Sequence, residues 1–600
     1  MRKLFSYLRP YRVSIVFIVL FIFLQSMLNL YLPQLMAHIV DKGVETGNIA
    51  YIWRVGGLML IASIAAVLFS VSAGFLSSRT AARFGKVLRG DVFAHVEDFT
   101  LREFDQIGTA SLITRATNDI TQVQQLVTMM LRMMIMAPLN FVGGVIMAVY
   151  TDAQLSWVIV VLIPLVALTI WMVFSKATVL FKAMQQKIDV LNRVLRENLT
   201  GVRVIRSFNR TAHEQHRFDK ANFDLTDTAT QAQKIMAVLM PTLMLIMNVS
   251  TLAIIWFGGI RINNEQMQIG SLIAFTQYVL QLLFSIMMVS VMFFMIPRAS
   301  AAAARIHEVL ETVPAIRDEN SALGRTAAPA TADFAAAAVF ATGSGKRDDT
   351  DRGFGRVEFR SVSFSYPGAE QPALDSITFT AEPGRVTAVI GGTGSGKSTL
   401  VNLIPRFYDV TSGAVLVDGV DVRNYPQVAL RSKIGLVPQK AVLFTGSIAD
   451  NLRYGKEDAS HEEIQRAADI AQASEFIAAM QDGYDSFIDQ GGTNVSGGQK
   501  QRLCIARALV RRPEIYIFDE SFSALDFKTD AKLRAALKAN VAGATVIIVA
   551  QRVSTVMDAD LIVVLDQGQV AGAGTHRQLL RSCQVYREIV ASQLSEEEIG

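Results

Sequence analysis

Six stretches, each close to the about 20 apolar residues that a helix needs to cross a bilayer, dominate the first half of this 600-residue sequence. They cover residues 13–34, 55–78, 127–150, 157–177, 235–259 and 271–296. Hydrophobic residues make up 51% of the chain and charged residues 18%, which excludes a disordered protein. The sequence therefore predicts an α-helical membrane domain with six transmembrane helices over residues 1–315.

The polar segments between these stretches alternate in length and charge. The long ones, 79–126 and 178–234, contain few Gly or Pro and are rich in Lys and Arg, and four basic residues precede the first stretch. The short ones are 35–54, 151–156 and 260–270. Because Lys and Arg accumulate on the cytoplasmic side, both termini and both long segments are predicted to be cytoplasmic. Apolar residues at three-to-four spacing predict that the long segments are cytoplasmic extensions of the membrane helices.

Within the long segments, 110–120 and 198–208 each place a short polar stretch midway between two predicted helices. The residues alone fit either a solvated helical turn or a docking element. Polar side chains also occur inside the spans, where they usually face protein or a cavity. They are Gln25, Asn29, Arg132, Asn140, Asn248, Gln277 and Gln281. Arg132 fits either snorkelling to the headgroups or a contact with a substrate or a lipid head. The methionine clusters 129–136 and 287–295 fit either packing or a cavity for varied apolar ligands.

Residues 316–355 are rich in Ala, Gly and Thr and predict a linker. They include TGSGK (342–346), which imitates a phosphate-binding loop. The imitation fails because Phe340 stands where the first Gly is needed, Arg347 follows the Lys, and no apolar strand precedes it.

A complete phosphate-binding loop, GGTGSGKS, occupies 391–398, between the β-branched run 385–390 and the apolar run 399–404. A strand before the loop and a helix after it are the context that this motif requires. Backbone amides of such a loop wrap the phosphates, and the helix N-terminus favours their charge. Lys397 would neutralise phosphate charge, and Ser398 would bind Mg²⁺. Residues 356–600 are therefore predicted to form an α/β P-loop ATPase domain.

Two further motifs in this half suit nucleotide chemistry. The apolar run 514–520 ends in Asp519, which suits holding Mg²⁺, and Glu520, which is placed to orient or deprotonate a water. VSGGQKQR (495–502) opens a helix with a Ser and two Gly, which is a second anion-binding arrangement.

Together these motifs resemble the ATP-binding cassette transporter family. VSGGQKQR resembles its signature, GGTGSGKST its Walker A motif, IYIFDE its Walker B motif, LVPQ (436–439) its Q-loop and SALD (523–526) its D-loop. Six membrane helices before one cassette resemble a half-size exporter. The resemblance implies that ATP and Mg²⁺ are the cofactors and that Glu520, Gln551 and Gln439 are catalytic. It implies metal contacts from Ser398, Gln439 and Asp519. It implies nucleotide contacts from Tyr366, Gly391, Gly392, Thr393, Gly394, Ser395, Gly396, Lys397, Ser398, Thr399, Ser496, Gly497, Gly498, Gln499 and Asp526.

The resemblance also implies how such a chain works. The signature of one cassette completes the ATP site of another, so the working unit is a dimer with two sites. Residues 110–120 and 198–208 would be coupling helices that dock on the cassettes. ATP-driven closure would turn a membrane cavity outward, and hydrolysis would reset it.

Three positions depart from the family pattern. Gln551 stands in AQR where the switch His is expected, and Gln cannot take up a proton. Gln490-Gly491-Gly492 replaces Glu-Arg-Gly before the signature, and Phe518 replaces an aliphatic residue, which we interpret as packing. An altered switch residue with an intact signature resembles one subunit of a heterodimeric exporter that has one degenerate ATP site. Glu520 argues partly against this, because degenerate sites commonly lose that carboxylate.

The sequence thus predicts a multi-pass plasma-membrane half-transporter that exports amphipathic drugs, lipids or peptides, with a second half-transporter chain and membrane lipid as partners. A net charge of +4 is too small for this length to indicate nucleic-acid binding. Two alternatives stay open: an exporter-fold importer of a metal chelate, and a regulatory subunit that binds ATP without hydrolysing it. Gln551 favours the regulatory subunit, whereas Glu520 and Gln439 disfavour it.

Overall fold

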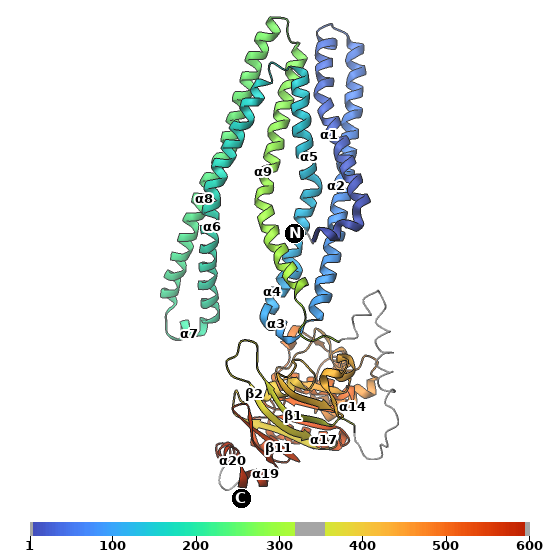
Figure 1. Cartoon of the computed structure of the whole chain (residues 1–600), viewed down its shortest axis with the longest axis vertical. Coiled ribbons are helices and arrows are strands. Elements are labelled where there is room, and N and C mark those ends of the chain that lie inside the picture. The colour runs from blue at the N-terminus through green and yellow to red at the C-terminus, as the bar shows by residue number, and fades with distance from the viewer. Residues whose placement is uncertain (1–3, 319–353, 595–600) are drawn as a thin grey trace. The chain divides into compact units, whose positions relative to one another are not determined.

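The computed structural model describes residues 4–318 and 354–594 (Figure 1). Contacts divide the chain into two units, Met1–Asp98 with Ile107–Thr312 and Phe99–Gln106 with Val313–Gly600. Most of the predicted linker, including the phosphate-loop imitation at 342–346, lies outside the described residues.

The first unit consists of long helices. Its elements are η1 (Leu4–Tyr11), α1 (Arg12–Ile39), η2 (Val40–Val44), α2 (Ile49–Glu97), α4 (Thr109–Thr114), η3 (Arg115–Asp119), α5 (Ile120–Thr151), α6 (Trp157–Thr200), α7 (Val202–Ser207), α8 (Thr211–Asn263) and α9 (Ile269–Glu311). Within the described residues, six helices are long and apolar enough to cross a membrane. Each predicted span lies inside one of α1, α2, α5, α6, α8 and α9, so the prediction of a six-helix membrane domain is confirmed.

The helices pack in pairs, α1 on α2, α5 on α9 and α6 on α8. In Figure 1 the α6–α8 pair diverges from α5 and α9 toward α7. Arg305 Nε and Nη2 of α9 donate to Asp119 Oδ2 and Oδ1 at 2.7 and 2.6 Å, and the Asp119 side chain is buried. A Cβ on Gly144 of α5 would lie 3.0 Å from Leu282 Cδ2. The bidentate ion pair therefore fixes α9 against η3, and the close approach at Gly144 fixes it against α5.

The two predicted short stretches differ from each other in the structure. Residues 198–208 contain α7, which joins α6 to α8. Residues 110–120 instead run through α4 and η3 directly into α5. The separate short helix lies earlier, at α3 (Leu101–Ile107), and Gly108, with a φ of 80°, divides it from α4. Phe99–Gln106, which includes most of α3, belongs to the second unit.

Two sheets form the core of the second unit. The larger sheet has the order β12-β11-β3-β10-β9-β6, in which only β12 is antiparallel to its neighbour. The smaller sheet is antiparallel, with the order β2-β1-β4-β5, and β7 pairs with β8. The strands are β1 (Val357–Phe364), β2 (Leu374–Ala381), β3 (Val386–Gly391), β4 (Ser412–Val417), β5 (Val420–Asp421), β6 (Ile434–Val437), β7 (Gly446–Ser447), β8 (Phe487–Ile488), β9 (Ile515–Asp519), β10 (Thr545–Val549), β11 (Leu561–Asp566) and β12 (Gln569–Gly574).

Helices surround these sheets. They are α11 (Lys397–Leu403), α12 (Gln427–Ser432), α13 (Ile448–Arg453), α14 (His461–Ile470), α15 (Ser474–Ala478), α16 (Gly497–Arg511), α17 (Phe527–Asn540), α18 (Val553–Val556), α19 (His576–Ser582) and α20 (Gln584–Ala591), with short turns η5 (Val422–Asn424), η6 (Gly483–Asp485) and η7 (Gln490–Gly492). Successive residues of a strand point to opposite faces. Accordingly, Val389 packs with the smaller sheet, whereas Ala388 and Ile390 pack with the cluster that contains α16. Burial on both faces explains the continuous apolar runs of these strands.

Candidate nucleotide-binding site

Four neighbouring parallel strands bring the predicted site residues to one edge of the larger sheet. The phosphate loop follows β3, and Asp519 ends β9 with Glu520 directly after it. Gln439 follows β6, and Gln551 follows β10. Because carboxyl ends of parallel strands share an edge, residues far apart in sequence meet there. This edge of an open α/β sheet is where ligands bind.

The loop between β3 and α11 has the backbone that its glycines require. Gly394 and Gly396 have φ values of 83° and 93°, in the left-handed region that glycine adopts readily. A Cβ on Gly392 or Gly394 would meet no atom within 4 Å, so this side of the loop is open. Ser395 Oγ is buried and has no hydrogen-bond partner within the described part of the chain. An open glycine loop with an unsatisfied buried hydroxyl fits a phosphate group.

Lys397, the first residue of α11, folds back over this loop. Its Nζ donates to the carbonyl oxygens of Gly391 at 3.0 Å and Gly392 at 2.7 Å. Burial lowers the pKa of Lys397, and the charges of Glu520 and Asp519 oppose that shift. A buried ammonium beside an open loop is placed to bind an anion.

Ser398 and Asp519 form the next contact, where Ser398 Oγ donates to Asp519 Oδ1 at 3.2 Å. Burial raises the pKa of Asp519, the charge of Glu520 adds to the effect, and the Ser398 hydrogen bond and Lys397 oppose it. Hydroxyl and carboxylate oxygens are ligands that Mg²⁺ prefers. The donor set therefore fits a magnesium ion shared with a nucleotide.

Glu520 is held between two carboxamides. Gln439 Nε2 donates to Glu520 Oε2 at 2.7 Å, and Gln551 Nε2 donates to Oε1 at 2.6 Å. Glu520 has a φ of 47°, which is unusual for a residue with a side chain and is typical of functional sites. Both partners are uncharged, so the carboxylate is oriented without being neutralised. The predicted trio of Glu520, Gln439 and Gln551 is thus brought into one hydrogen-bonded group.

Tyr366 lies beside the phosphate-loop helix. Its hydroxyl is 3.0 Å from Thr399 Oγ1, and its ring meets Phe364 and Tyr408 edge to face, with centroids 4.9 and 5.5 Å away. The ring is partly exposed. This position is compatible with the adenine contact that the resemblance implies.

The signature residues form the start of α16. Ser496 Oγ accepts from Gln499 N at 3.3 Å, and Gln499 Oε1 accepts from Ser496 N at 2.8 Å, which is a capping box. Asp526 of the D-loop similarly caps α17 through Thr529 N, at 2.9 Å. Across residues 4–318 and 354–594, no hydrogen bond or salt bridge joins Ser496–Gln499 to the phosphate loop. The structure therefore does not bring the signature to this chain's own loop.

The other departures have local structural reasons. Gly491 and Gly492 have φ values of 68° and 67°. This left-handed conformation disfavours Arg, which the family pattern has at the position of Gly491. Phe518 is fully buried and packs near Tyr516 and Phe522, as the packing interpretation expects.

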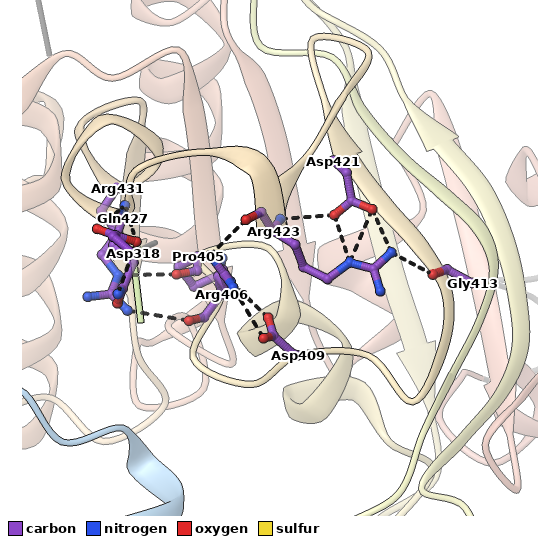
Figure 2. A network of polar contacts seen from close by, with 9 residues as sticks. All are labelled: Asp318, Pro405, Arg406, Asp409, Gly413, Asp421, Arg423, Gln427 and Arg431. Atoms are coloured by element: carbon purple, nitrogen blue, oxygen red, sulfur yellow. Dashed lines mark hydrogen bonds and ion pairs between the residues drawn. The ribbon is translucent and has the colours of Figure 1, made fainter. Parts of the chain in front are cut away.

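Sequence reasoning missed the network that supports α11 (Figure 2). Arg431 Nε and Nη2 donate to the carbonyl oxygens of Pro405 and Arg406 at 3.2 and 3.3 Å, just beyond the helix. Burial lowers the pKa of Arg431, while the charge of Asp318 opposes that shift. Asp318 Oδ2 accepts from Gln427 N at 3.1 Å. Arg406 has a positive φ of 53°, which helps to orient these carbonyl groups toward Arg431. No sequence motif indicates this conformation.

Comparison with known proteins identifies this architecture. Residues 15–286 match the family described as ABC transporter transmembrane region, and 374–523 match the ABC transporter family. An uncharacterized ABC transporter ATP-binding protein of Mycobacterium tuberculosis is 44% identical over 598 residues, covering 99% of this chain and 98% of the relative. The chain belongs to the ABC transporter family. Its ATPase domain therefore binds ATP, and ABC half-transporters such as this one dimerise with a second chain.

Further relatives support the exporter architecture of this ABC transporter. An ATP-dependent lipid A-core flippase of Aromatoleum aromaticum is 33% identical, covering 99% of this chain and 96% of the relative. The solved structure of a bacterial Atm1-family ABC exporter with ATP bound has a TM-score of 0.77 at 25% identity, covering 98% of this chain and 99% of that one. The ABC transporter is thus a multi-pass membrane protein with the exporter fold, whose ATPase is coupled to transport.

Proposed function

We propose that this ABC transporter is one half of a heterodimeric plasma-membrane exporter of amphipathic compounds, and that its own Walker motifs form the weaker of two ATP sites. The observation that carries this proposal is the hydrogen bond of 2.6 Å that Gln551 Nε2 donates to Glu520 Oε1. The family has a histidine at the position of Gln551. A carboxamide can hold the carboxylate but cannot exchange a proton with it at neutral pH.

In this proposal the backbone of Gly391–Gly396, Lys397, Ser398 and Thr399 binds the phosphates of ATP, and Tyr366 contacts adenine. Ser398 and Asp519 would hold Mg²⁺ with help from Gln439, and the bound ion would neutralise phosphate charge. Glu520, oriented by Gln439 and Gln551, polarises the attacking water. Ser496, Gly497, Gly498 and Gln499, with Asp526, complete the site on the second chain. The N-terminus of α16 suits this role because its first amides, those of Gly497 and Gly498, point along the helix axis toward an anion, and the helix dipole favours negative charge there.

The decisive test compares Glu520→Gln in this chain with the equivalent substitution in the second half-transporter, using purified chains in lipid. We expect the chain alone to be nearly inactive as an ATPase. In the pair, the partner's substitution should lower activity by about 100-fold or more, the usual effect of losing a catalytic group, and Glu520→Gln should lower it less than about threefold. If the chain alone hydrolyses ATP and Glu520→Gln stops it, the chain works as a homodimer and the proposal is wrong.

Gln551→His should strengthen this chain's own site. In a pair whose second catalytic carboxylate is neutralised, we expect the remaining ATPase to rise by at least about tenfold, since a positioned acid–base group contributes 10²-fold or more. Its pH profile should gain a step near the ordinary histidine pKa of about 6.5. Gln551→Asn is the control, because it breaks the Glu520 contact without adding a titratable group. An unchanged rate and profile in Gln551→His would show that this residue does not limit the site.

A further inference from the structure

Three of the polar side chains inside the predicted spans meet at one hollow between α5 and α9. Asn140 of α5 and Gln277 and Gln281 of α9 line a pocket of about 380 Å³ together with Met136, Phe284 and Met288. Gln277 and Gln281 are one helical turn apart, so their side chains lie on the same face of α9. We call this hollow the carboxamide pocket.

The polar side chains of the carboxamide pocket keep hydrogen-bonding groups that the described part of the chain does not satisfy. Asn140 is 8% exposed, and its Oδ1 is buried without a hydrogen-bond partner among the described residues. A buried carboxamide oxygen without a partner destabilises the fold, so an apolar residue would suit packing better. Ser285, which also lines the pocket, already donates to the Gln281 carbonyl at 2.8 Å. Free hydrogen-bonding capacity therefore lies with the three carboxamides.

Two apolar hollows adjoin this pocket along α9. One, of about 760 Å³ between α5, α6 and α9, shares Ser285 with it and contains Trp171. The other, of about 230 Å³ between α6, α8 and α9, shares Phe284 with it and is lined by Met240, Met244, Met247 and Met287. A ligand with its polar end at the carboxamides would thus find apolar, partly methionine-lined space for its hydrocarbon. Adaptable methionines suit hydrocarbon groups of varied shape.

Charge is missing from all three hollows, since the described residues that line them include no Asp, Glu, Lys, Arg or His. Arg132, the cation nearest in sequence on α5, lies against Gly74 of α2, whose Cβ would be 3.7 Å from Arg132 Nη1. An ionised group placed here would lose its hydration without gaining a counter-charge. Carboxamides both donate and accept hydrogen bonds, which matches hydroxyl, ester and amide groups.

We propose that the carboxamide pocket binds the uncharged, hydrogen-bonding head of an amphipathic substrate whose hydrocarbon enters the adjoining hollows. The substrate class is therefore a neutral amphiphile, such as an acylglycerol or an uncharged acyl amide, rather than an anionic or cationic lipid. This inference rests on the proposed export function for its purpose, but the binding itself requires no nucleotide.

Trp171 provides a direct readout of binding, because it lies in the adjoining apolar hollow. The chain has four tryptophans, so Trp53→Phe, Trp157→Phe and Trp256→Phe together leave Trp171 alone. The full chain in phosphatidylcholine nanodiscs, without nucleotide, is titrated with dibromostearoyl monoglyceride, whose bromine quenches tryptophan. We expect saturable quenching that monoolein reverses. Dibromostearoyl lysophosphatidate and dibromostearylamine, which carry a similar tail and a charged head, should bind at least about tenfold more weakly.

Substitutions in the pocket then test whether the head group of the ligand binds to the carboxamides. Asn140→Leu and Gln281→Met keep the side-chain volume, and each should weaken monoglyceride binding by up to about tenfold, the value of one lost hydrogen bond. Gln25→Leu removes a polar residue of α1 that does not line the pocket, and should change nothing. Gln281→Glu should reverse the preference toward dibromostearylamine, which a merely misfolded variant could not do.

Quenching that is absent, that ignores the head group, or that is the same in Gln281→Met and Gln281→Glu as in the native chain would overturn the inference. Because the titration uses no ATP, its failure is separable from failure of the export proposal. The latter is tested by the Glu520→Gln comparison, which uses no lipid ligand.

Discussion

Lys397→Met should weaken ATP binding at this chain's own site by about 100-fold or more. In the structure the ammonium is buried against the loop carbonyls of Gly391 and Gly392, beside Asp519 and Glu520. Hydrogen bonds to charged groups contribute about 1.5–3 kcal/mol each, and a phosphate can accept at least two from this side chain. Methionine has similar length but neither charge nor donors. The measurement is titration of the purified chain with a fluorescent ATP analogue, by anisotropy.

The chain provides its own control for this experiment. Lys346 ends TGSGK, the same five letters as 393–397, but it lies outside the described residues, and Phe340 and Arg347 replace the first Gly and the Ser or Thr of the complete motif. Lys346→Met should leave ATP affinity within about twofold, because the sequence around Lys346 lacks two residues that a complete phosphate-binding motif requires. If the two substitutions weakened binding equally, the assignment of the phosphate loop to 391–398 would be wrong.

The two TGSGK sequences show what the sequence could predict. The order of strand, loop and helix is local, and glycines at positive φ occur where the motif needs them. The six spans were equally predictable, because length and hydropathy are local properties. The sequence could also place Asp519 and Glu520 at a strand end, since an apolar run that stops at two carboxylates requires no knowledge of its neighbours.

Other parts of the site depend on packing that no local pattern encodes. Gln439 and Gln551 donate to opposite oxygens of Glu520 because β6 and β10 both flank β9 in the sheet. Strand order is a long-range property, so the motifs gave the residues but not this contact. Arg431 was missed for the same reason, since its partners are backbone carbonyls of Pro405 and Arg406.

The membrane unit shows the same division. Asn140, Gln277 and Gln281 were noticeable as polar residues in apolar spans, but only the packing of α9 on α5 places them at one pocket. Conversely, 110–120 looked like a separate polar stretch, although it continues into α5. Polar residues do not end a helix when no Gly or Pro interrupts them, and Gly108 marks the break in the structure.

Asp519→Asn should have opposite effects on stability and on activity. Burial raises the pKa of Asp519, so the folded chain holds this proton more tightly than the unfolded chain does. The resulting stability is complete below the ordinary Asp pKa of about 3.9 and is lost as the pH rises through the raised value. At pH 7 without nucleotide, the ionised carboxylate therefore destabilises the cassette. Asparagine is neutral at every pH and removes that cost.

We expect Asp519→Asn to stabilise the nucleotide-free chain at pH 7 by about 1 kcal/mol, which is within the usual range for a stabilising substitution, and to change its stability little at pH 4. Thermal denaturation at the two pH values measures this difference. In the pair whose second catalytic carboxylate is neutralised, Mg²⁺-dependent ATPase should fall by about 10²-fold or more, because a preorganised charge at the phosphates is lost.

Asp530→Asn is the control that distinguishes a role at the nucleotide site from the effect of burying a carboxylate. Asp530 of α17 is also buried, with its pKa raised by burial, and it pairs with Arg534 Nε at 3.4 Å rather than with the phosphate loop. Its substitution should leave the Mg²⁺ dependence of the ATPase unchanged. If both variants lost activity equally, Asp519 would be an ordinary buried carboxylate. If Asp519→Asn gained no stability at pH 7, the ionised Asp519 carboxylate would not destabilise the cassette. A stability gain confined to pH 7, joined to loss of activity in Asp519→Asn alone, would mean that the fold keeps an unfavourable charge because the metal and nucleotide require it.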